Sequence, residues 1–495
     1  MLESAEVGHC ISKERYERDE PPLRTALLNA QYDLFARQRG PLLIIISGVG
    51  GGGRSETAKQ LTEWMDPRHI QVSAFGEPAP EARVRPLQWR YWHALPPTGR
   101  IGIFMDAWYG DVLMNRSAGK LNAAEMEVSL QDIRPFEAML DREGVVLIKF
   151  WIHLSREAQK ARLKALAADP RTRWRVSAAD KRFQARYGKA RELCEHALRE
   201  TSTAGAPWCV VEGTDERYRA LTVGKIILDT LQRAVAPRPR RKAASSAASP
   251  APGVVDNVAL IRNLDLSKAL TEKIYARELA RYQAELDALT RHKRFHKRSL
   301  VAVFEGIDAA GKGGAIRRVT GALDARRYVI VPISAPSDEE RAHPYLWRFW
   351  RYIPARGGIT LFDRSWYGRV LVERVEALSP VADWMRAYDE INQFEEHLTD
   401  SGVVVVKFWL QISQAEQLRR FKAREKTPFK RFKITPDDWR NRKQWGAYEK
   451  AVADMVDRTS TELAPWTLVE AEDKRYARVK VLQTLVERLQ GVLEG

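Results

Sequence analysis

The chain has 495 residues, a length that one hydrophobic core rarely supports, so two or more domains are expected. Its residues are 44% hydrophobic, which is enough for sizeable cores, and its apolar runs are too short to cross a membrane. The formal net charge of +17 indicates a polyanionic partner, which could be nucleic acid, a membrane surface or a phosphate polymer. A basic, solvated surface without a partner is the alternative.

The amino-terminal segment and the cysteines favour a cytoplasmic protein that does not enter the membrane. The first ten residues lack the apolar core of a signal peptide. Cys10, Cys194 and Cys209 are odd in number and match no paired metal or redox spacing. We therefore expect a reducing cytoplasm as the location.

In chain order, a charged helical segment precedes PLLIIISGVGGGGRSETAKQL at residues 41–61, a pattern that predicts a strand, a glycine-rich turn and a helix. Much further on, a basic Pro/Ala/Ser-rich stretch has nothing with which to build a core and predicts a linker. We place the linker at residues 236–255, between a first domain of residues 1–235 and a second of residues 256–495.

The second domain repeats the first at a fixed offset. Setting Gly48 against Gly306 gives 306 − 48 = 258, and this offset aligns several rare aromatic motifs without a gap. The aligned motifs are QWRYW (88–92) with LWRFW (346–350), WYG (108–110) with WYG (366–368), KFW (149–151) with KFW (407–409) and APW (206–208) with APW (464–466). So many rare aromatic residues would not align at one offset by chance, so we expect a tandem duplication.

Each copy alternates apolar strand-like runs with longer helical patterns, which predicts an α/β fold with a parallel sheet flanked by helices. In the second copy the expected strands are 300–304, 328–332, 359–362, 403–409 and 467–470. Ligands of such sheets bind beyond the carboxyl ends of the strands. The residues that follow strands 300–304 and 359–362 should therefore share one crevice.

The sequence LVAVFEGIDAAGKGGAIRRVT, at residues 300–320, joins a strand to a helix through the pattern G-x-x-x-x-G-K. Small residues let backbone N–H groups converge on phosphate oxygens at the positive end of the helix, and the lysine adds a mobile charge. We predict a phosphate-binding loop, or P-loop, against the alternative of an ordinary glycine-rich turn. The expected phosphate-binding residues are Gly306, Ala310, Gly311, Lys312, Gly313 and Gly314.

Gly313 stands where most P-loop enzymes carry a hydroxyl that binds Mg²⁺, so another group must hold the metal. Asp308 lies inside the loop, and Asp363 directly follows an apolar strand, as a Walker-B carboxylate does. We predict that these two aspartates bind Mg²⁺ and that Arg364 clamps a phosphoryl group with its planar guanidinium. A surface Asp–Arg pair at a strand end is the alternative.

Residues 422–433, KAREKTPFKRFK, gather six cations around a proline. Such a segment can close over phosphates as a basic helical lid and exclude water, which favours phosphoryl transfer over hydrolysis. A surface helix followed by a turn is the alternative. Further expected phosphate-binding cations are Arg369, Arg424, Lys430, Arg431 and Lys433. The basic run at residues 291–298 fits a polyanion contact and a solvated helix end equally.

Three motifs carry a family resemblance. GIDAAGKGG (306–314), FDRSWYGR (362–369) and the basic segment ending in KRFKIT (430–435) resemble the signature regions of the polyphosphate kinase 2 family, and the resemblance spans the whole chain, once per copy. It implies a P-loop kinase fold, Mg²⁺ and transfer of the terminal phosphoryl group of inorganic polyphosphate to a nucleotide. The tandem arrangement is similar to members that convert AMP to ADP. The implied catalytic residues are Asp308, Lys312, Asp363 and Arg364.

Two other readings stay open on the residues alone. An ATP-dependent nucleoside monophosphate kinase would also place an Asp–Arg pair at a strand end after a P-loop, as thymidylate-type kinases do. A non-catalytic polyanion-binding protein would bind with a steep salt dependence, but no nucleic-acid-binding motif supports it. The sequence leaves open the nucleotide base, AMP against ADP as acceptor, the polymer length, the net direction and the assembly state, a homo-oligomer included.

The first copy lacks the chemical residues of the second. At the offset of 258, Asp308, Lys312, Asp363 and Arg364 correspond to Gly50, Arg54, Met105 and Asp106. A bulky guanidinium does not replace a compact ammonium in a tight phosphate cradle, and both metal carboxylates are gone. We expect only the second copy to be catalytic and the first to be kept for packing against it.

Overall fold

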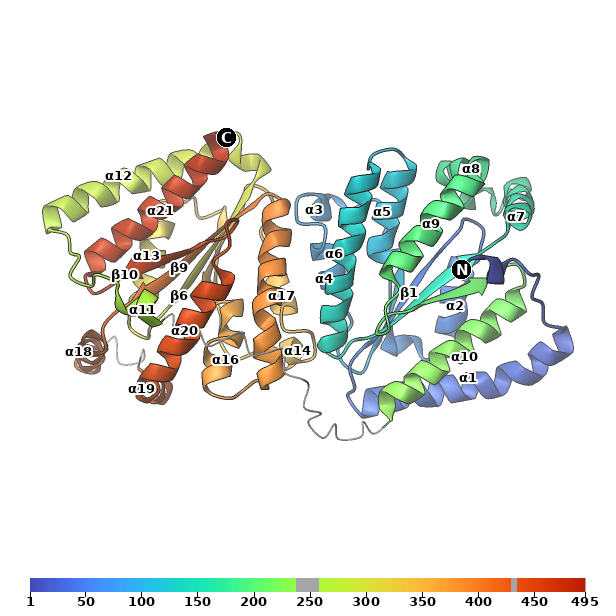
Figure 1. Cartoon of the computed structure of the whole chain (residues 1–495), viewed down its shortest axis with the longest axis horizontal. Helices are drawn as coiled ribbons and strands as arrows, with labels where there is room; N and C mark the ends of the chain where they lie inside the picture. The colour runs from blue at the N-terminus through green and yellow to red at the C-terminus, as the bar shows by residue number, and fades with distance from the viewer. Residues whose placement is uncertain (237–257, 429–433, 495) are drawn as a thin grey trace. The chain divides into compact units, whose positions relative to one another are not determined.

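A computed structural model describes residues 1–236, 258–428 and 434–494, so nearly all of the predicted linker lies outside the described residues. The chain forms two units, each built mainly from one copy (Figure 1). Of the described residues, the first unit contains Met1–Pro78, residues 90–236 and Pro336–Trp347, and the second contains Ala79–Trp89 and residues 258–335, 348–428 and 434–494.

The first copy folds around a parallel sheet with the strand order β2-β3-β1-β4-β5. Its strands are β1 (Leu42–Gly48), β2 (Ile70–Ala74), β3 (Ile101–Met105), β4 (Val146–His153) and β5 (Trp208–Glu212). Its α-helices are α1 (Lys13–Ala36), α2 (Arg54–Trp64), α3 (Pro80–Arg83), α4 (Trp89–His93), α5 (Ala107–Ser117), α6 (Ala123–Arg142), α7 (Arg156–Ala168), α8 (Ala178–Ala185), α9 (Tyr187–Thr201) and α10 (Glu216–Val235). Short 3₁₀ turns are η1 (Glu3–Ala5), η2 (Pro67–His69) and η3 (Arg173–Arg175).

The second copy forms a parallel sheet with the order β10-β9-β6-β8-β7. Its strands are β6 (Ser299–Gly306), β7 (Tyr328–Pro332), β8 (Ile359–Asp363), β9 (Val403–Gln411) and β10 (Trp466–Glu470). Its α-helices are α11 (Val258–Arg262), α12 (Glu272–Arg291), α13 (Lys312–Thr320), α14 (Asp338–Arg341), α15 (Trp347–Trp350), α16 (Val372–Val375), α17 (Val381–Asp400), α18 (Gln414–Glu425), α19 (Pro436–Lys443), α20 (Trp445–Thr459) and α21 (Lys474–Glu494). The 3₁₀ turns are η4 (Phe295–Lys297) and η5 (Trp366–Arg369).

The two sheets share topology and register. Leu42 pairs with Ile101 where β1 meets β3, and Leu300 pairs with Ile359 where β6 meets β8, so the sequence offset of 258 holds in the strand pairing. The central strands are buried on both faces, as the continuous apolar runs predict. The predicted parallel sheet flanked by helices is therefore confirmed in both copies.

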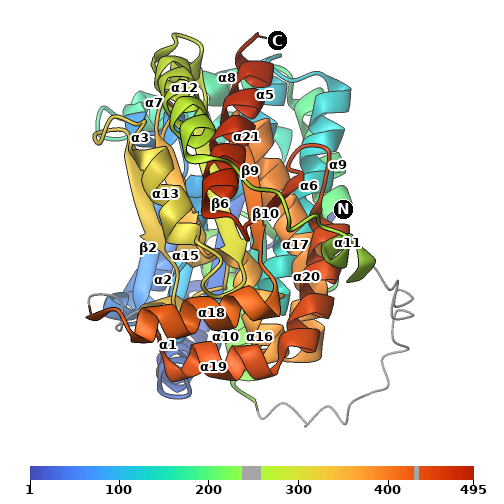
Figure 2. The same ribbon diagram turned by 90° about the vertical axis from the view of Figure 1, so that its left-hand side faces the viewer.

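Helices cover both faces of the second sheet. One face is covered by α13 and α21, with α12 packed on α21, and the other by α17 and α20. Figure 2 shows α18 and α19 side by side across one end of this sheet, below α13. Because a P-loop and a helix after β9 both start at the carboxyl ends of strands, that end is where a ligand site is expected.

The shared aromatic motifs surround a buried ion pair in each unit. Lys407 donates from Nζ to Glu395 at 2.6 Å, to the Tyr367 hydroxyl at 2.8 Å and to the Thr459 carbonyl at 2.7 Å, and Trp366 donates to Glu395 at 3.0 Å. The first unit repeats this network with Lys149, Glu137, Tyr109, Thr201 and Trp108. The repeated aromatics thus belong to the core of the fold. Among the described residues, no helix has the length and apolar character that a membrane span requires.

Candidate active site

The loop after β6 has the backbone geometry of a phosphate cradle. Gly306 adopts φ +152°, and a Cβ there would lie 2.6 Å from the Leu410 carbonyl oxygen, so only glycine fits. Helix α13 begins at Lys312, and Gly311 before it provides no side-chain cap for the first N–H groups of the helix. Those donors and the positive end of the helix dipole are therefore available to an anion.

Lys312 lies at the mouth of this loop. Its Nζ donates to the Gly306 carbonyl at 2.7 Å, a contact that holds the ammonium beside the N–H groups of the loop. Buried Arg420 supports the loop from below, because its guanidinium donates to the carbonyls of Ala309 and Ala310 at 2.9 Å each. Arg420 thereby fixes two carbonyls of the loop on the side of α18.

The residues after β8 reach the same loop. Arg364 adopts φ +66°, a left-handed conformation that is unfavourable for a non-glycine residue, and its N–H donates to the Phe304 carbonyl at 3.0 Å. Its guanidinium donates to Asp308 Oδ1 at 3.1 Å. Asn441 of α19 donates to the other oxygen, Oδ2, at 2.9 Å. Asp308 thus connects the loop, the turn after β8 and α19, of which the sequence placed the first two together and missed Asn441.

A buried carboxylate, Glu305, lies beneath this cluster, and the sequence reasoning missed it. It accepts a hydrogen bond from the Ser365 hydroxyl at 2.9 Å. Burial raises the pKa of Glu305 above its usual value, against the opposing effects of Lys312, Ser365 and Arg364. A lone acid in an otherwise apolar strand, where the first copy has Ser47, was the available signal.

Four carboxylates act electrostatically on the guanidinium of Arg364. Burial lowers the pKa of Arg364, but Asp308, Glu305, Asp363 and Asp438 outweigh it and raise the pKa above its usual value. Among the described residues, no cluster of three or more histidine, cysteine or acidic side chains could hold a metal by itself. Two carboxylates nevertheless fit Mg²⁺, because this ion commonly takes one or two carboxylates and completes its shell with water and substrate phosphates.

The other predicted phosphate-binding residues are placed differently. Arg369 forms an ion pair with Glu373 at 2.8 Å. Arg424 lies on α18 next to the loop, and burial lowers its pKa. Lys430, Arg431 and Lys433, the core of the predicted lid, lie outside the described residues.

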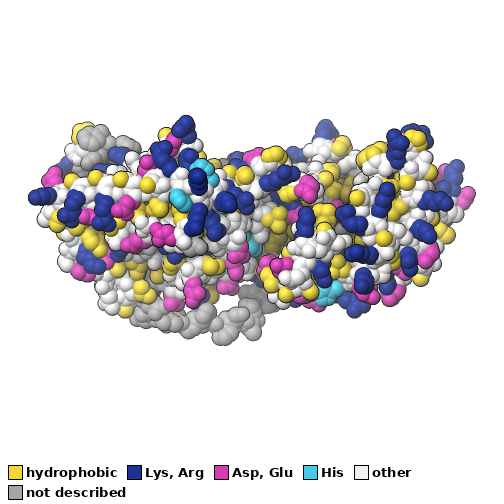
Figure 3. All heavy atoms as spheres, turned by 90° about the horizontal axis from the view of Figure 1, so that it is seen from above, with side chains coloured by type: hydrophobic (Ala, Val, Ile, Leu, Met, Phe, Trp, Pro, Cys, Tyr) yellow, Lys and Arg dark blue, Asp and Glu magenta, His cyan; other side chains and the backbone are white. Residues whose placement is uncertain are grey.

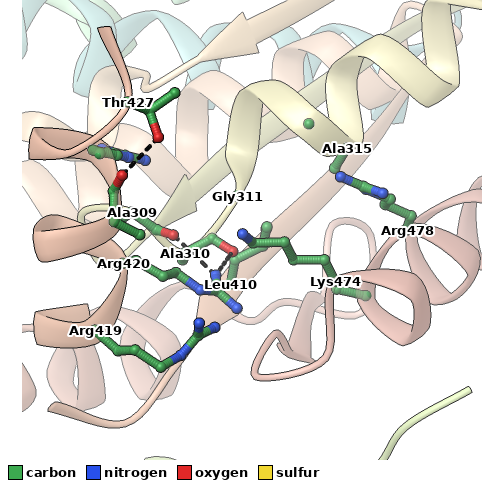
Figure 4. A pocket seen from close by; sticks show the side chains of 14 residues that line it. Ala309, Ala310, Gly311, Ala315, Leu410, Arg419, Arg420, Thr427, Lys474 and Arg478 are labelled. Atoms are coloured by element: carbon green, nitrogen blue, oxygen red, sulfur yellow. Dashed lines mark hydrogen bonds between the residues drawn. The ribbon is translucent and has the colours of Figure 1, made fainter. Parts of the chain in front are cut away.

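A cation-lined pocket of about 230 Å³ adjoins the P-loop. One wall is the loop itself, from Ala309 to Gly311, and the cations come from α18 and from the first turns of α21 (Figure 4). In Figure 4 the Lys474 amine extends toward Gly311, and Arg478 lies beside α13 near Ala315. The cationic lining residues are Arg419, Arg420, Arg424, Lys474 and Arg478.

The pocket has more positive charge than its own acids neutralise. Glu416 pairs with Arg419 and Arg420 at 2.5 Å. Much of the Lys474 side chain is exposed, yet crowding of its amine by protein atoms and the charges of Arg420, Arg419 and Arg478 lower its pKa to about 8. On the face drawn in Figure 3, by contrast, Lys and Arg side chains are interspersed with acidic ones. Cations that destabilise one another in a pocket indicate an anionic ligand.

The first unit lacks most of this machinery at the corresponding positions, although Arg162 stands in the place of Arg420. Arg54 forms an ion pair with Asp106 across its loop. A Cβ on Gly50, the counterpart of Asp308, would lie 1.9 Å from Asp180 Oδ1, so the Asp180 carboxyl occupies that place. At the offset of 258, the pocket cations Arg419, Arg424, Lys474 and Arg478 correspond to Ala161, Leu166, Glu216 and Ala220. This copy-to-copy difference is the signal by which the pocket could have been found from sequence.

The sequence was compared with known proteins. The family model described as Polyphosphate kinase 2 matches residues 10–239 and, separately, residues 269–493. This chain belongs to the polyphosphate kinase 2 family. The two matches confirm the predicted tandem of P-loop kinase-like domains.

Full-length relatives and a solved structure agree with membership of the polyphosphate kinase 2 family. A polyphosphate:AMP phosphotransferase of Pseudomonas aeruginosa is 56% identical over 490 residues, 99% of each chain. One from Pseudomonas syringae pv. tomato is 53% identical over 492 residues, 99% of this chain and 98% of the relative. A crystal structure assigned to polyphosphate kinase 2 from Pseudomonas aeruginosa PA01 matches with a TM-score of 0.91 at 53% identity, over 100% of this chain and 99% of that one.

Proposed function

We propose that this protein transfers the terminal phosphoryl group of inorganic polyphosphate to AMP and releases ADP. The observation that carries the proposal is the cation-lined pocket of about 230 Å³ beside a P-loop that has its lysine and carboxylates in place. The pocket cations Lys474 and Arg478, which form no ion pair with an acid among the described residues, suit a donor that carries a negative charge on every unit of the chain. The family relationship and the names of the full-length relatives support the same reaction.

In this proposal the donor polymer lies in the pocket with its terminal phosphate at the P-loop. The N–H groups at the start of α13 and the Lys312 ammonium neutralise the terminal phosphoryl oxygens. Arg364 provides a planar pair of donors to the same group as charge develops on it. The N–H groups of the helix start are fixed by the backbone before the substrate arrives, so these donors need little reorganisation during transfer.

The reaction breaks the bond between the terminal phosphorus and its bridging oxygen. A phosphate oxygen of AMP forms the new bond to phosphorus, and the bridging oxygen stays with a polymer one unit shorter. Arg364 must exchange its contact with Asp308 for a contact with phosphate, so Asp308 becomes available as substrate binds. Phosphoryl transfer requires alignment and charge neutralisation rather than covalent help from the protein, and these residues supply both.

Asp308 and Asp363 are the residues that would hold Mg²⁺, consistent with their joint electrostatic effect on Arg364 and the absence of a hydroxyl at Gly313. The ion would neutralise phosphate oxygens of donor and acceptor. Asn441 would keep Asp308 oriented through its Oδ2 contact while Arg364 moves away.

We further propose that only the second copy is catalytic. The ion pair of Arg54 with Asp106 and the Asp180 carboxyl over Gly50 support this view, because they occupy the first loop with the protein's own groups. The loss of every pocket cation except Arg162, the counterpart of Arg420, supports it as well.

A donor assay tests the function. Purified full-length protein is incubated with AMP, Mg²⁺ and either polyphosphate or ATP, and ADP formation is measured. We expect rapid product from polyphosphate and little from ATP. Product from ATP alone would instead support an ATP-dependent nucleoside monophosphate kinase, and no product from either donor, with salt-sensitive polyphosphate binding, would support a binding protein.

A further inference from the structure

A second cationic cluster adjoins the donor pocket, on the side where α12, α13 and α21 come together. The Tyr275 hydroxyl of α12 accepts a hydrogen bond from Arg318 Nε of α13 at 3.4 Å and one from Arg478 Nη1 of α21 at 3.5 Å. Figure 2 shows these helices side by side. We name Tyr275, Arg318 and Arg478 the exit cluster. Arg478 also lines the pocket, so pocket and cluster are continuous.

The exit cluster holds two guanidinium groups that no carboxylate neutralises among the described residues. Arg318 donates hydrogen bonds to the Tyr275 hydroxyl and the Gly314 carbonyl, and Arg478 donates one to the same hydroxyl. Burial would raise the pKa of Tyr275, but the two arginines outweigh it and lower the pKa below its usual value. Two like charges that share one neutral acceptor leave most of their hydrogen-bonding capacity unused.

The opposite rim of the pocket differs. There Arg419 is paired with Glu416 at 2.5 Å, so its charge is already compensated. A polyanion that leaves the pocket therefore finds uncompensated cations along α13 and a neutralised ion pair at the other rim. The first unit has no counterpart of the cluster, because Tyr275, Arg318 and Arg478 correspond at the offset of 258 to Glu17, Gln60 and Ala220.

We propose that the exit cluster binds the part of a long polyphosphate that extends beyond the pocket and so gives the enzyme a preference for long chains. This inference rests on the proposed function. A cavity of about 230 Å³ holds only a short stretch of polymer, so a longer donor must continue over the protein surface. A guanidinium group can donate to two phosphate oxygens at once, and each such contact adds binding affinity that weakens as the salt concentration rises.

The test compares Arg318→Gln with wild type on two donors, a short polyphosphate that fills only the pocket and a long-chain one. We expect the KM for the long chain to rise roughly fivefold and its salt dependence to flatten, because one phosphate contact is lost, while the KM for the short donor changes much less. Arg318→Lys should restore most of the long-chain affinity. Lys59→Gln on α2, the counterpart helix of the first unit, removes the same charge and should leave both KM values unchanged.

Equal changes for both donors, or none for either, would overturn the inference. If Arg318→Gln does not fold, Tyr275→Phe removes only the shared acceptor and should shift the long-chain KM in the same direction by a smaller factor. Calorimetric titration of the full chain with long-chain polyphosphate, without nucleotide, separates the two proposals. Polyphosphate binding that depends on Arg318, without any phosphoryl transfer, would refute the proposed function and support polymer binding at the exit cluster. Phosphoryl transfer without any dependence on Arg318 would support the proposed function and refute polymer binding at the exit cluster.

Discussion

Asp308 is held from two sides before any substrate binds, by Arg364 through one oxygen and by Asn441 through the other. The site is therefore arranged as an ion-pair network that a phosphoryl group and a metal would reorganise. Single substitutions in this network should affect turnover far more than folding, because the residues lie on the half-buried ligand side of the sheet.

Asp363→Asn should reduce turnover with polyphosphate and AMP by more than tenfold. A neutral amide is a poor Mg²⁺ ligand, and loss of metal-held charge should cost several kcal/mol of transition-state stabilisation. Circular dichroism and the unfolding midpoint check that the fold is intact. Activity above about a tenth of wild type would mean that Asp363 does not hold the metal.

The pKa of Lys474, lowered to about 8, predicts a pH dependence of donor affinity. As pH rises through this value the free pocket loses one positive charge, so the KM for polyphosphate should rise about threefold between roughly pH 7 and pH 9. Lys474→Arg keeps its charge over this range and should flatten the profile. An identical profile in both proteins would assign the titration to another group.

At the scale of single elements, the repeated ion pairs explain why the aromatic motifs hold register. Glu395→Gln and Glu137→Gln should each lower the unfolding midpoint, with a loss of roughly 3 kcal/mol, because each leaves a buried lysine without its counter-charge. Asp229→Asn, which breaks the exposed pair with Arg233, is the control and should change stability by less than about 0.5 kcal/mol. Equal effects for buried and exposed pairs would contradict this assignment.

The elements differ in how far sequence could predict them. The five strands of the second sheet were placed to within about two residues, because buried parallel strands are continuous apolar runs bounded by turns. The sequence predicted a helix after the P-loop but not its first residue, Lys312, since the glycines at the helix start have no helical pattern. The pocket was not anticipated, because Lys474 and Arg478 form no recognisable motif within the last helix, and only a comparison of the two copies distinguishes them.

On the scale of the whole molecule, the two units share a fold and differ in chemistry. Lys312→Ala should eliminate phosphoryl transfer, whereas Arg54→Ala should leave most of it, because Arg54 is already engaged by Asp106. Turnover of both variants under identical conditions is the measurement, with the unfolding midpoint of each as a folding control. Equal losses in the two variants would show that both loops work.

The turn that follows β3 in the first unit and β8 in the second has a consequence for how such proteins change over time. Asp106 and Arg364 occupy the same place in it, with φ +64° and φ +66°, although one is an acid and the other a base. The backbone conformation is therefore the same in both copies, whereas the side chain differs. A left-handed, non-glycine residue directly after a strand and next to a glycine-rich loop therefore marks the position of a former phosphate site. This backbone feature identifies such a site even in a chain whose sequence carries no recognisable motif.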